Sequence, residues 1–302
     1  MWKGQLTFES PMLFSVGFVA MFVIGGLSGV THSIVPSDWQ QTDTYYIVGH
    51  FHYVLFGGAI FGLFSGLYYW YPKLRGRLMN ERLGKIHFWL MFIGMNMTFA
   101  PMHWLGLQGM VRRTWKYPAE AGLETWNQIE TIGAFTIALS ILFFMYNWWR
   151  SKTHGEPSGL DPWDARTVER MIPNPTPEYN FAVSPVVESL DDFWRRKYTE
   201  DEEGRAVRRP EADQVIADLE EIGHNPPAPI HLPNPSYFPF LVGLAITIIS
   251  YGIIYHTSDW GKALVVGGVL LTLISFIGWG IEPLEDEPDD AAPGNLQPAE
   301  AH

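Results

Sequence analysis

Residues 45–70 read YYIVGHFHYVLFGGAIFGLFSGLYYW, an apolar stretch long enough to cross a bilayer as one helix. Within it, His50-Phe51-His52 places two imidazoles two residues apart. A helix has about 3.6 residues per turn, so positions i and i+2 point about 200° apart. The two histidines therefore cannot chelate one metal together, but each can bind its own metal, since imidazole suits iron, copper and zinc. One membrane helix between two metal cofactors is an arrangement for electron transfer.

The composition favours a membrane protein and excludes thiol chemistry. Charged residues make up 17% of the 302 residues, below the share of about 25% in soluble domains. The chain has no cysteine, which excludes disulfides, zinc–thiolate sites, iron–sulfur ligation and thiol nucleophiles. The net charge of −12 comes mainly from residues 150–233 and from the tail that starts at Glu282. This acidity gives no reason to expect nucleic-acid binding.

Six stretches approach the length of about 20 apolar residues that a membrane-spanning helix needs. They are Pro11–Ile34, Tyr45–Tyr71, Leu83–Leu105, Ile129–Trp149, Tyr237–Tyr255 and Lys262–Ile281. The pattern predicts an all-α, polytopic transmembrane helical bundle of about six spans.

The predicted organisation has four parts. Residues 1–150 form a four-span membrane bundle, and residues 151–234 form a proline-rich and acidic connecting segment. Residues 235–282 form a two-span membrane extension, and residues 283–302 form a disordered acidic tail. Within the connecting segment, two short helices are predicted. Their ranges are Val187–Tyr198 and Ala212–Ile222, the second with an apolar face.

Lysine and arginine in the short loops predict the orientation in the membrane. The loop after the second span is basic and should be cytoplasmic; its cations are Lys73, Arg75, Arg77, Arg82 and Lys85. The N-terminus, the 151–234 segment and the tail are then cytoplasmic as well, in a multi-pass protein of the inner (plasma) membrane.

The loop Gly106–Gln128 should lie outside, yet it contains Arg112 and Arg113. A haem bound near His50 and His52 would place its propionates at this depth, and paired arginines suit carboxylates. Taken alone, the arginine pair is better interpreted as ordinary loop surface. Its shared depth with two intramembrane histidines, which are rare and usually functional, favours the propionate interpretation.

Several other polar residues are candidates for a functional or a structural role. Asp38 and Asp43 are either solvated loop acids or neighbours of the propionates that share protons or bind a divalent cation. His103 has a supporting or interfacial role in preference to a ligand role. For Glu130, a position at the membrane interface is preferred to a role in proton movement. His32 is interpreted as structural.

These residues resemble a known family. The stretch Asp43–Val54 resembles the tenth-helix signature of haem–copper oxidase subunit I, the catalytic subunit of respiratory cytochrome c oxidase. Three further matches lie along the chain in the same order as in the family. They are Gly25–Val30 (end of the ninth helix), His103–Arg113 (outer loop) and Trp126–Trp149 (twelfth helix). The resemblance thus covers the C-terminal half of subunit I. Residues 150–281 are similar, more weakly, to the extended C-terminus of some bacterial subunits I.

The resemblance implies haem ligands. His50 would be the catalytic proximal ligand of the high-spin haem at which oxygen is reduced, and His52 one of two axial ligands of the low-spin haem. Phe51 would then lie between the two haems as a bridge.

The resemblance also implies a polar cluster above the haems. Arg112 and Arg113 would pair with the propionates, with Asp38 and Asp43 beside them. Asp43 would also be a ligand of a non-redox Mg or Mn ion. Thr42, however, stands where many members have a histidine that helps to bind this ion, so the metal site lacks that donor here.

The implied reaction passes electrons from cytochrome c through two haems, of type A, to a haem–copper centre where oxygen becomes water while protons are pumped. A quinol donor is the alternative. The copper ligands and the second axial histidine belong to an N-terminal half absent from this sequence, so the chain alone is expected to be inactive. Further expected partners are oxidase subunits II and III and membrane lipid. The alternative from another class is a non-catalytic membrane subunit or relict fragment.

Overall fold

The structure is a computed structural model that describes residues 6–227, 230 and 235–283. The chain divides into two units, Met1–Pro226 and Pro227–His302, and each unit is helical. The all-α polytopic fold predicted from the sequence is confirmed. The disordered tail predicted for residues 283–302 lies, apart from Pro283, outside the described residues.

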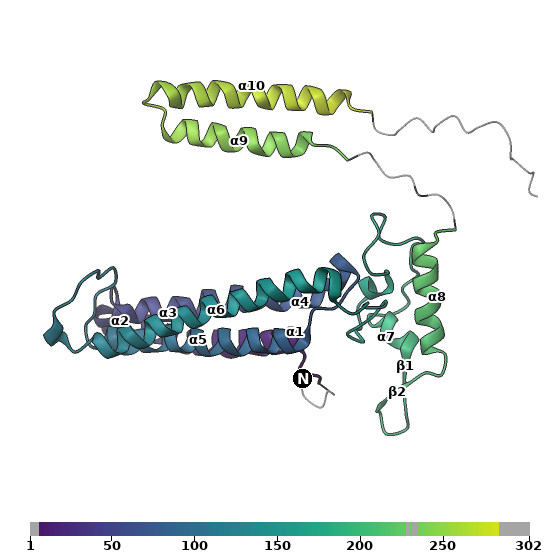
Figure 1. Cartoon of the computed structure of the whole chain (residues 1–302), viewed down its shortest axis with the longest axis horizontal. Coiled ribbons are helices and arrows are strands. Elements are labelled where there is room, and N and C mark those ends of the chain that lie inside the picture. The colour runs from purple at the N-terminus through teal and green to yellow at the C-terminus, as the bar shows by residue number, and fades with distance from the viewer. Residues whose placement is uncertain (1–5, 228–229, 231–234, 284–302) are drawn as a thin grey trace, which may run out of the picture. The chain divides into compact units, whose positions relative to one another are not determined.

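The first unit contains a bundle of long helices (Figure 1). Its helices are α1 (Ser10–Ser33), α2 (Val35–Gln41), α3 (Tyr45–Leu55), α4 (Phe61–Arg75), α5 (Glu81–Leu107) and α6 (Glu124–His154). A π-helical turn, Phe56–Ile60, joins α3 to α4, so residues 45–75 form one continuous helix.

Three of these helices are long and apolar enough to cross a membrane, namely α1, the joined α3–α4 and α6. Helix α5 has 27 residues, which is also a sufficient length, and the polar residues His87, Asn96 and His103 make it less apolar. The four spans predicted within residues 1–150 therefore each coincide with a helix of the bundle.

Helices α5 and α6 pack antiparallel and in close contact. A Cβ atom on Gly94 of α5 would lie 2.9 Å from the backbone nitrogen of Ile137, and one on Gly133 of α6 would lie 2.6 Å from that of Thr98. Only glycine allows the two backbones to approach so closely, as is common between membrane helices. These contacts set the register of α5 against α6.

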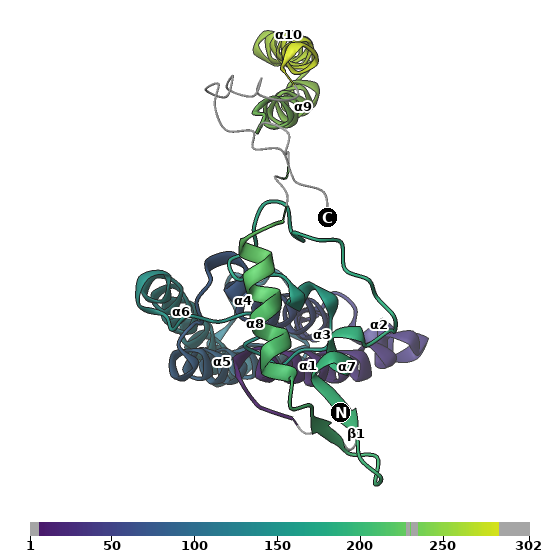
Figure 2. The same cartoon turned by 90° about the vertical axis from the view of Figure 1, so that its right-hand side faces the viewer.

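The bundle has two different ends. Helix α2 and the loop 108–123 lie at one end, which we call the loop end (Figure 1). At the other end, residues 155–226 form a folded segment that we call the cap segment. Figure 2 shows its helix α8 (Ala212–His224) crossing over the ends of the bundle helices.

The cap segment has its own small core. Leu160, Met171 and Phe193 are buried together, and Ile216 and Leu219 of α8 pack against them. Its remaining elements are a 3₁₀ turn (Val168–Met171), α7 (Asp192–Lys197) and the antiparallel strands β1 (Tyr198–Glu200) and β2 (Ala206–Arg208).

One of the two short helices was predicted too long. Helix α8 agrees with the predicted Ala212–Ile222, but the predicted Val187–Tyr198 shrinks to α7. Residues 187 and 188 are not helical, and Tyr198 leaves the helix because it pairs with Arg208 in the β-hairpin. This cross-strand partner lies ten residues away, and a local helical pattern cannot reveal it.

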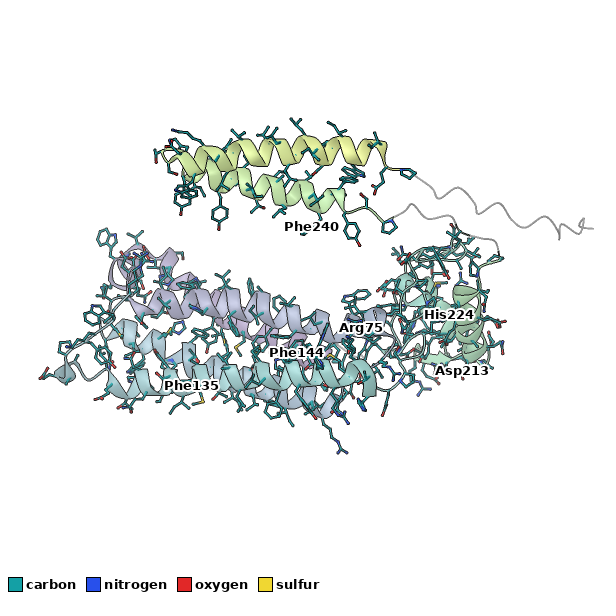
Figure 3. The ribbon with its side chains drawn as sticks, turned by 45° about the horizontal axis from the view of Figure 1, so that its top comes forward. Arg75, Phe135, Phe144, Asp213, His224 and Phe240 are labelled. Carbon is teal, nitrogen blue, oxygen red and sulfur yellow. The ribbon has the colours of Figure 1, made fainter. Side chains whose placement is uncertain are left out.

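Arg170 attaches the cap segment to the end of α4. Its side chain is fully buried, with the guanidinium 4.1 Å from the ring centroid of Tyr69 and 4.9 Å from that of Trp70. Arg170 Nη2 and Trp163 Nε1 both donate to the Tyr69 carbonyl, each at 3.0 Å. Figure 3 shows Arg75, the last residue of α4, next to this segment.

The second unit is a hairpin of two apolar helices, α9 (Phe238–Ile254) and α10 (Asp259–Ile281). Small buried residues line their contact, among them Ala245, Gly252 and Gly268. Helix α10 is long enough to cross a membrane, and α9 is an apolar helix of 17 residues. The two spans predicted for residues 237–281 thus correspond to two helices.

Candidate functional site

His50 points from α3 towards α1. Its Nδ1 lies 2.9 Å from the Gly25 carbonyl oxygen and 3.0 Å from the Ser28 hydroxyl. Because a carbonyl can only accept, the Nδ1–H of the imidazole donates to Gly25. This hydrogen bond leaves the lone pair of the ring on Nε2, which has no partner among the described residues.

His52 points to the opposite side of the same helix, towards α5. Its Nδ1 donates to the carbonyl of Val48, one turn earlier, at 2.8 Å. The ring stacks on Phe99 of α5, with centroids 4.2 Å apart and planes 12° apart. Thus the structure places the two imidazoles on opposite faces of α3, as their spacing of two residues requires. The Phe51 ring lies 4.6 Å from that of His52.

At the loop end, Asp43 and Arg112 connect the link between α2 and α3 to the loop 108–123. Their side chains form an ion pair, and the Arg112 backbone N–H donates to the Asp43 carbonyl at 2.9 Å. Next to this pair, the Tyr45 N–H donates to the Met110 carbonyl, also at 2.9 Å. Arg113 is exposed and has a left-handed backbone, with φ of 66°. The structure therefore brings Asp43 to Arg112, and Arg113 follows them on the surface.

Asp38 is connected to the surroundings of His50 through His32. An Asp38 oxygen lies 3.5 Å from Nδ1 of His32, and the His32 ring lies 5.1 Å from that of His50 and 5.3 Å from that of Tyr46. From the sequence, His32 was interpreted as structural, and its proximity to His50 was not predicted. The available signal was the spacing of residues 25, 28, 29 and 32, which share one face of a helix.

His103 is the second histidine whose place only the structure reveals. Its ring lies edge-on to Tyr46 and Tyr53, at 4.9 and 5.6 Å. Its Nε2 is buried without a partner among the described residues. Thr42, the position at which a histidine was expected, is exposed.

The donor set of this region suits haem iron. Histidine ligands commonly donate their second ring N–H to a backbone carbonyl, which fixes the ring and raises its basicity, and His50 and His52 both do so. Within the described ranges, no three His, Asp or Glu side chains gather into a site for a bare metal ion. One imidazole on each side of α3 fits an iron held within a macrocycle better than a free ion.

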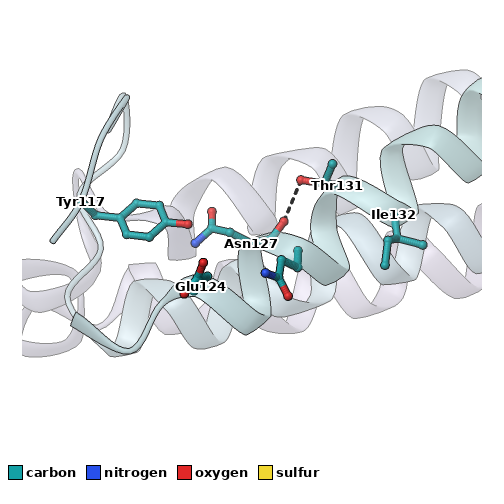
Figure 4. Close-up of a pocket in the computed structure, with 6 residues that line it drawn as sticks. Tyr117, Glu124, Asn127, Thr131 and Ile132 are labelled. Atoms are coloured by element: carbon teal, nitrogen blue, oxygen red, sulfur yellow. Dashed lines mark hydrogen bonds between the residues drawn. The ribbon is translucent and has the colours of Figure 1, made fainter. Parts of the chain in front are cut away.

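Two cavities of the described structure lie away from these residues. A pocket of about 420 Å³ at the loop end is lined by Tyr117 and by the first turns of α6, including Glu124, Asn127 and Thr131. Figure 4 shows these residues, with the Thr131 hydroxyl donating to the Asn127 carbonyl at 2.8 Å. A groove of about 550 Å³ lies between the start of α1 and α4. None of the predicted site residues lines either cavity.

Comparison with known proteins identifies the family. Residues 1–136 match the model of "Cytochrome C and Quinol oxidase polypeptide I". Cytochrome c oxidase subunit 1 of Bacillus sp. (strain PS3) is 41% identical over 275 residues, which are 90% of this chain and 42% of that protein. The probable cytochrome c oxidase subunit 1-beta of Nocardia farcinica is 47% identical over 191 residues, which are 63% of this chain and 32% of that protein.

Among solved structures, a haem–copper terminal oxidase dimer aligns with a TM-score of 0.42 and 15% identity, covering 71% of this chain and 41% of that chain. This likeness is too weak to add to the assignment. Through residues 1–136, the chain belongs to the subunit I family of cytochrome c and quinol oxidases. It spans less than half the length of the curated relatives. Four helices of the described residues are long and apolar enough to cross a membrane, which agrees with membership of this family of membrane proteins.

Proposed function

We propose that this chain is part of the catalytic subunit of a respiratory terminal oxidase and supplies one axial ligand to each of two haems. His50 binds the high-spin haem and His52 the low-spin haem. When bound, these haems supply electron transfer from cytochrome c and the reduction of oxygen, coupled to proton pumping. The observation that supports this proposal most strongly is the fixed pair of imidazoles on opposite faces of α3, each donating Nδ1–H to a carbonyl.

The residues around the two imidazoles hold them in place. The carbonyls of Gly25 and Val48 set the ring tautomers, so that Nε2 is the ligating atom on both sides. Phe99 supports His52 by stacking. Phe51, between the two ligands in the chain, packs between the cofactors.

The arginines of the loop end hold the carboxylates of the cofactors. Arg112 and Arg113 pair with propionates, and Asp38 and Asp43 complete the polar cluster. Asp43 already pairs with Arg112, so this arginine is shared between Asp43 and a propionate. With Thr42 beside it in place of an imidazole, Asp43 is at most one ligand of a Mg or Mn ion.

The rest of the catalytic centre comes from outside this chain. The chain covers 42% of the length of its Bacillus relative, which supports an N-terminal half of subunit I as the first partner. That half supplies the second axial histidine and the copper ligands, and without it the chain is inactive. Subunits II and III, haem A and bound membrane lipid complete the complex. Cytochrome c is the donor, and the quinol oxidases of the same family make quinol the alternative.

The proposed orientation in the plasma membrane is based on the positive charge of the loop after α4, which places this loop in the cytoplasm. The N-terminus, residues 151–234 and the tail are cytoplasmic, and the loop end faces outside. Residues 1–150 form the haem-binding bundle, residues 235–282 a two-span extension, and residues 283–302 the tail. The cap segment, which lies within 151–234, then contacts other subunits on the cytoplasmic side.

The test is the haem content of the complex purified from the native membrane. His50→Ala is expected to remove the high-spin haem signal and His52→Ala the low-spin signal. His154→Ala, on an exposed residue at the end of α6, is the matched control and keeps both. A full haem complement in the first two variants contradicts the proposal, and a colourless wild-type chain that purifies alone supports a relict fragment. The pyridine haemochrome spectrum identifies the haem type.

The electron donor needs a separate measurement. Oxygen consumption by the purified complex with reduced cytochrome c and with quinol, each as the sole donor, distinguishes the two. Turnover with quinol alone would replace cytochrome c in the proposal.

A further inference from the structure

Glu130 is a buried carboxyl that the proposed haem chemistry does not use. It lies in the second turn of α6 and is only 7% exposed. Its Oε1 is buried and has no hydrogen-bond partner among the described residues. No lysine, arginine or histidine of the described chain lies within ion-pair distance of it. A carboxylate buried in a membrane bundle without a counter-ion is strongly disfavoured, and a buried polar atom without a partner is rare in folded proteins.

The packing of α6 on α5 shows what Glu130 faces. Gly133 of α6 lies against Thr98 of α5, and the Trp126 and Trp104 rings lie 6.4 Å apart. Glu130 lies between these two contacts on α6, so it comes level with the part of α5 between Thr98 and Trp104. This part of α5 contains Pro101.

Pro101 changes the hydrogen bonding of α5 at this point. Proline has no N–H, so it cannot donate to the carbonyl of residue 97, four positions earlier. The carbonyl carbon of Met97 lies 2.8 Å from the point that a Cβ on Gly133 would occupy. The Met97 carbonyl, which receives no hydrogen bond from residue 101, therefore lies on the side of α5 that packs against α6. It is next to Gly133, about one helical turn after Glu130.

We propose that Glu130 is a proton-binding site, held as a neutral carboxylic acid in the loop-end half of the bundle. A neutral acid can donate a hydrogen bond to a carbonyl such as that of Met97, whereas a carboxylate can only accept. The part of α5 between Thr98 and Trp104 contains one titratable residue, His103, whose ring lies against Tyr46 and Tyr53. Tyr45 and Tyr117 pack against one small cluster around Leu105 and Met110.

Solvent is close to this site. Asn127, one turn before Glu130 on α6, lines the pocket of Figure 4. The Asn127 amide donates to the Leu123 carbonyl at 2.8 Å, and Thr131, the residue after Glu130, also lines the pocket. A proton bound at Glu130 therefore exchanges with the aqueous phase of the loop end.

Infrared spectroscopy of the purified complex tests this inference, because a protonated carboxyl has a C=O stretch well separated from that of a carboxylate. The wild type at neutral pH should show such a band, and it should shift on transfer to heavy water. The wild-type-minus-Glu130→Gln difference spectrum should contain it, and Glu130→Asp should shift its frequency. Glu124→Gln is the matched control, an exposed glutamate of the same helix, and should leave the band unchanged.

A wild-type-minus-Glu130→Gln difference spectrum that lacks the carboxyl band overturns the inference. If Glu130→Gln fails to assemble, the frequency shift in Glu130→Asp remains the test, and an unshifted band is then the contrary outcome. The inference depends on the packing of α5 and α6 and not on haem ligation. Haem content measured on the same samples reports separately on His50 and His52.

Discussion

A Cβ atom at position 29 would lie 2.8 Å from Cε1 of His50. Gly29 therefore forms the wall of α1 against which the His50 imidazole rests, one turn after the Gly25 carbonyl that accepts its Nδ1–H. The absence of a side chain at residue 29 is what leaves room for the ring.

Gly29→Ala should displace the His50 ring and weaken its hydrogen bond to Gly25. Loss of such a supporting contact typically lowers metal affinity about 10- to 100-fold, so the high-spin haem should be depleted while the low-spin haem stays. Optical spectra of the purified complex measure both haems. Gly26→Ala is the control, because no atom lies within 4 Å of its added Cβ. Equal haem loss in both variants would contradict the assigned role of Gly29.

Phe99→Leu should act on the other side of α3. It removes the aromatic face on which His52 stacks, a contact worth about 0.5–1.5 kcal/mol. The expected result is a shifted low-spin haem spectrum and about 3- to 10-fold weaker retention of that haem. Phe135→Leu, on an α6 residue that is 73% exposed and labelled in Figure 3, is the control. An unchanged spectrum in Phe99→Leu would show that the stack does not position His52.

Arg170→Met should release the cap segment from α4. The substitution removes two cation–π contacts and a hydrogen bond to the Tyr69 carbonyl, and a desolvated cation–π contact alone contributes about 2 kcal/mol. Limited proteolysis should then cleave residues 155–226 faster in membranes. The control is Arg205→Met, whose side chain is 72% exposed. Equal cleavage of the variant and the wild type would mean that other contacts hold the segment.

The cap segment should also loosen in acid. Burial raises the pKa of Asp164, but hydrogen bonds from Lys197 (2.7 Å) and Tyr198 (2.5 Å) outweigh it and hold this pKa below its usual 3.8. Because the folded state has the lower pKa, Asp164 stabilises the fold above about pH 4, and this contribution disappears as the pH falls through the folded value. Protease sensitivity of the segment should therefore rise on acidification below about pH 4.

Asp164→Asn is the variant for this pH effect. It should make the segment more sensitive at neutral pH and should weaken the acid dependence, since the titrating group is gone. Asp218→Asn, on an exposed residue of α8, is the comparison, and its acid profile should follow the wild type. Parallel profiles for Asp164→Asn and the wild type would assign the acid effect to another group.

The sequence by itself predicted the features that depend on local periodicity. Apolar stretches of sufficient length predicted the helices, and the spacing of His50 and His52 predicted that they face opposite sides, because the angle between residues i and i+2 is a property of any helix. The resemblance to oxidase subunit I also depended only on the order of residues along the chain, and the comparisons support the same family. Roles for individual residues remain proposals.

Tertiary structure decided which atoms these helices bring together. The carbonyl of Gly25 reaches His50 across 25 positions in sequence, and His32 lies beside His50 only because α1 packs against α3. Glu130 is buried because its helix, α6, packs against α5. From its position near the start of α6, a place at the membrane interface was predicted. The cap segment is attached to α4 because Arg170 packs on Tyr69 and Trp70. Burial and partner identity depend on neighbours distant in sequence, and a single-helix pattern contains no information about them.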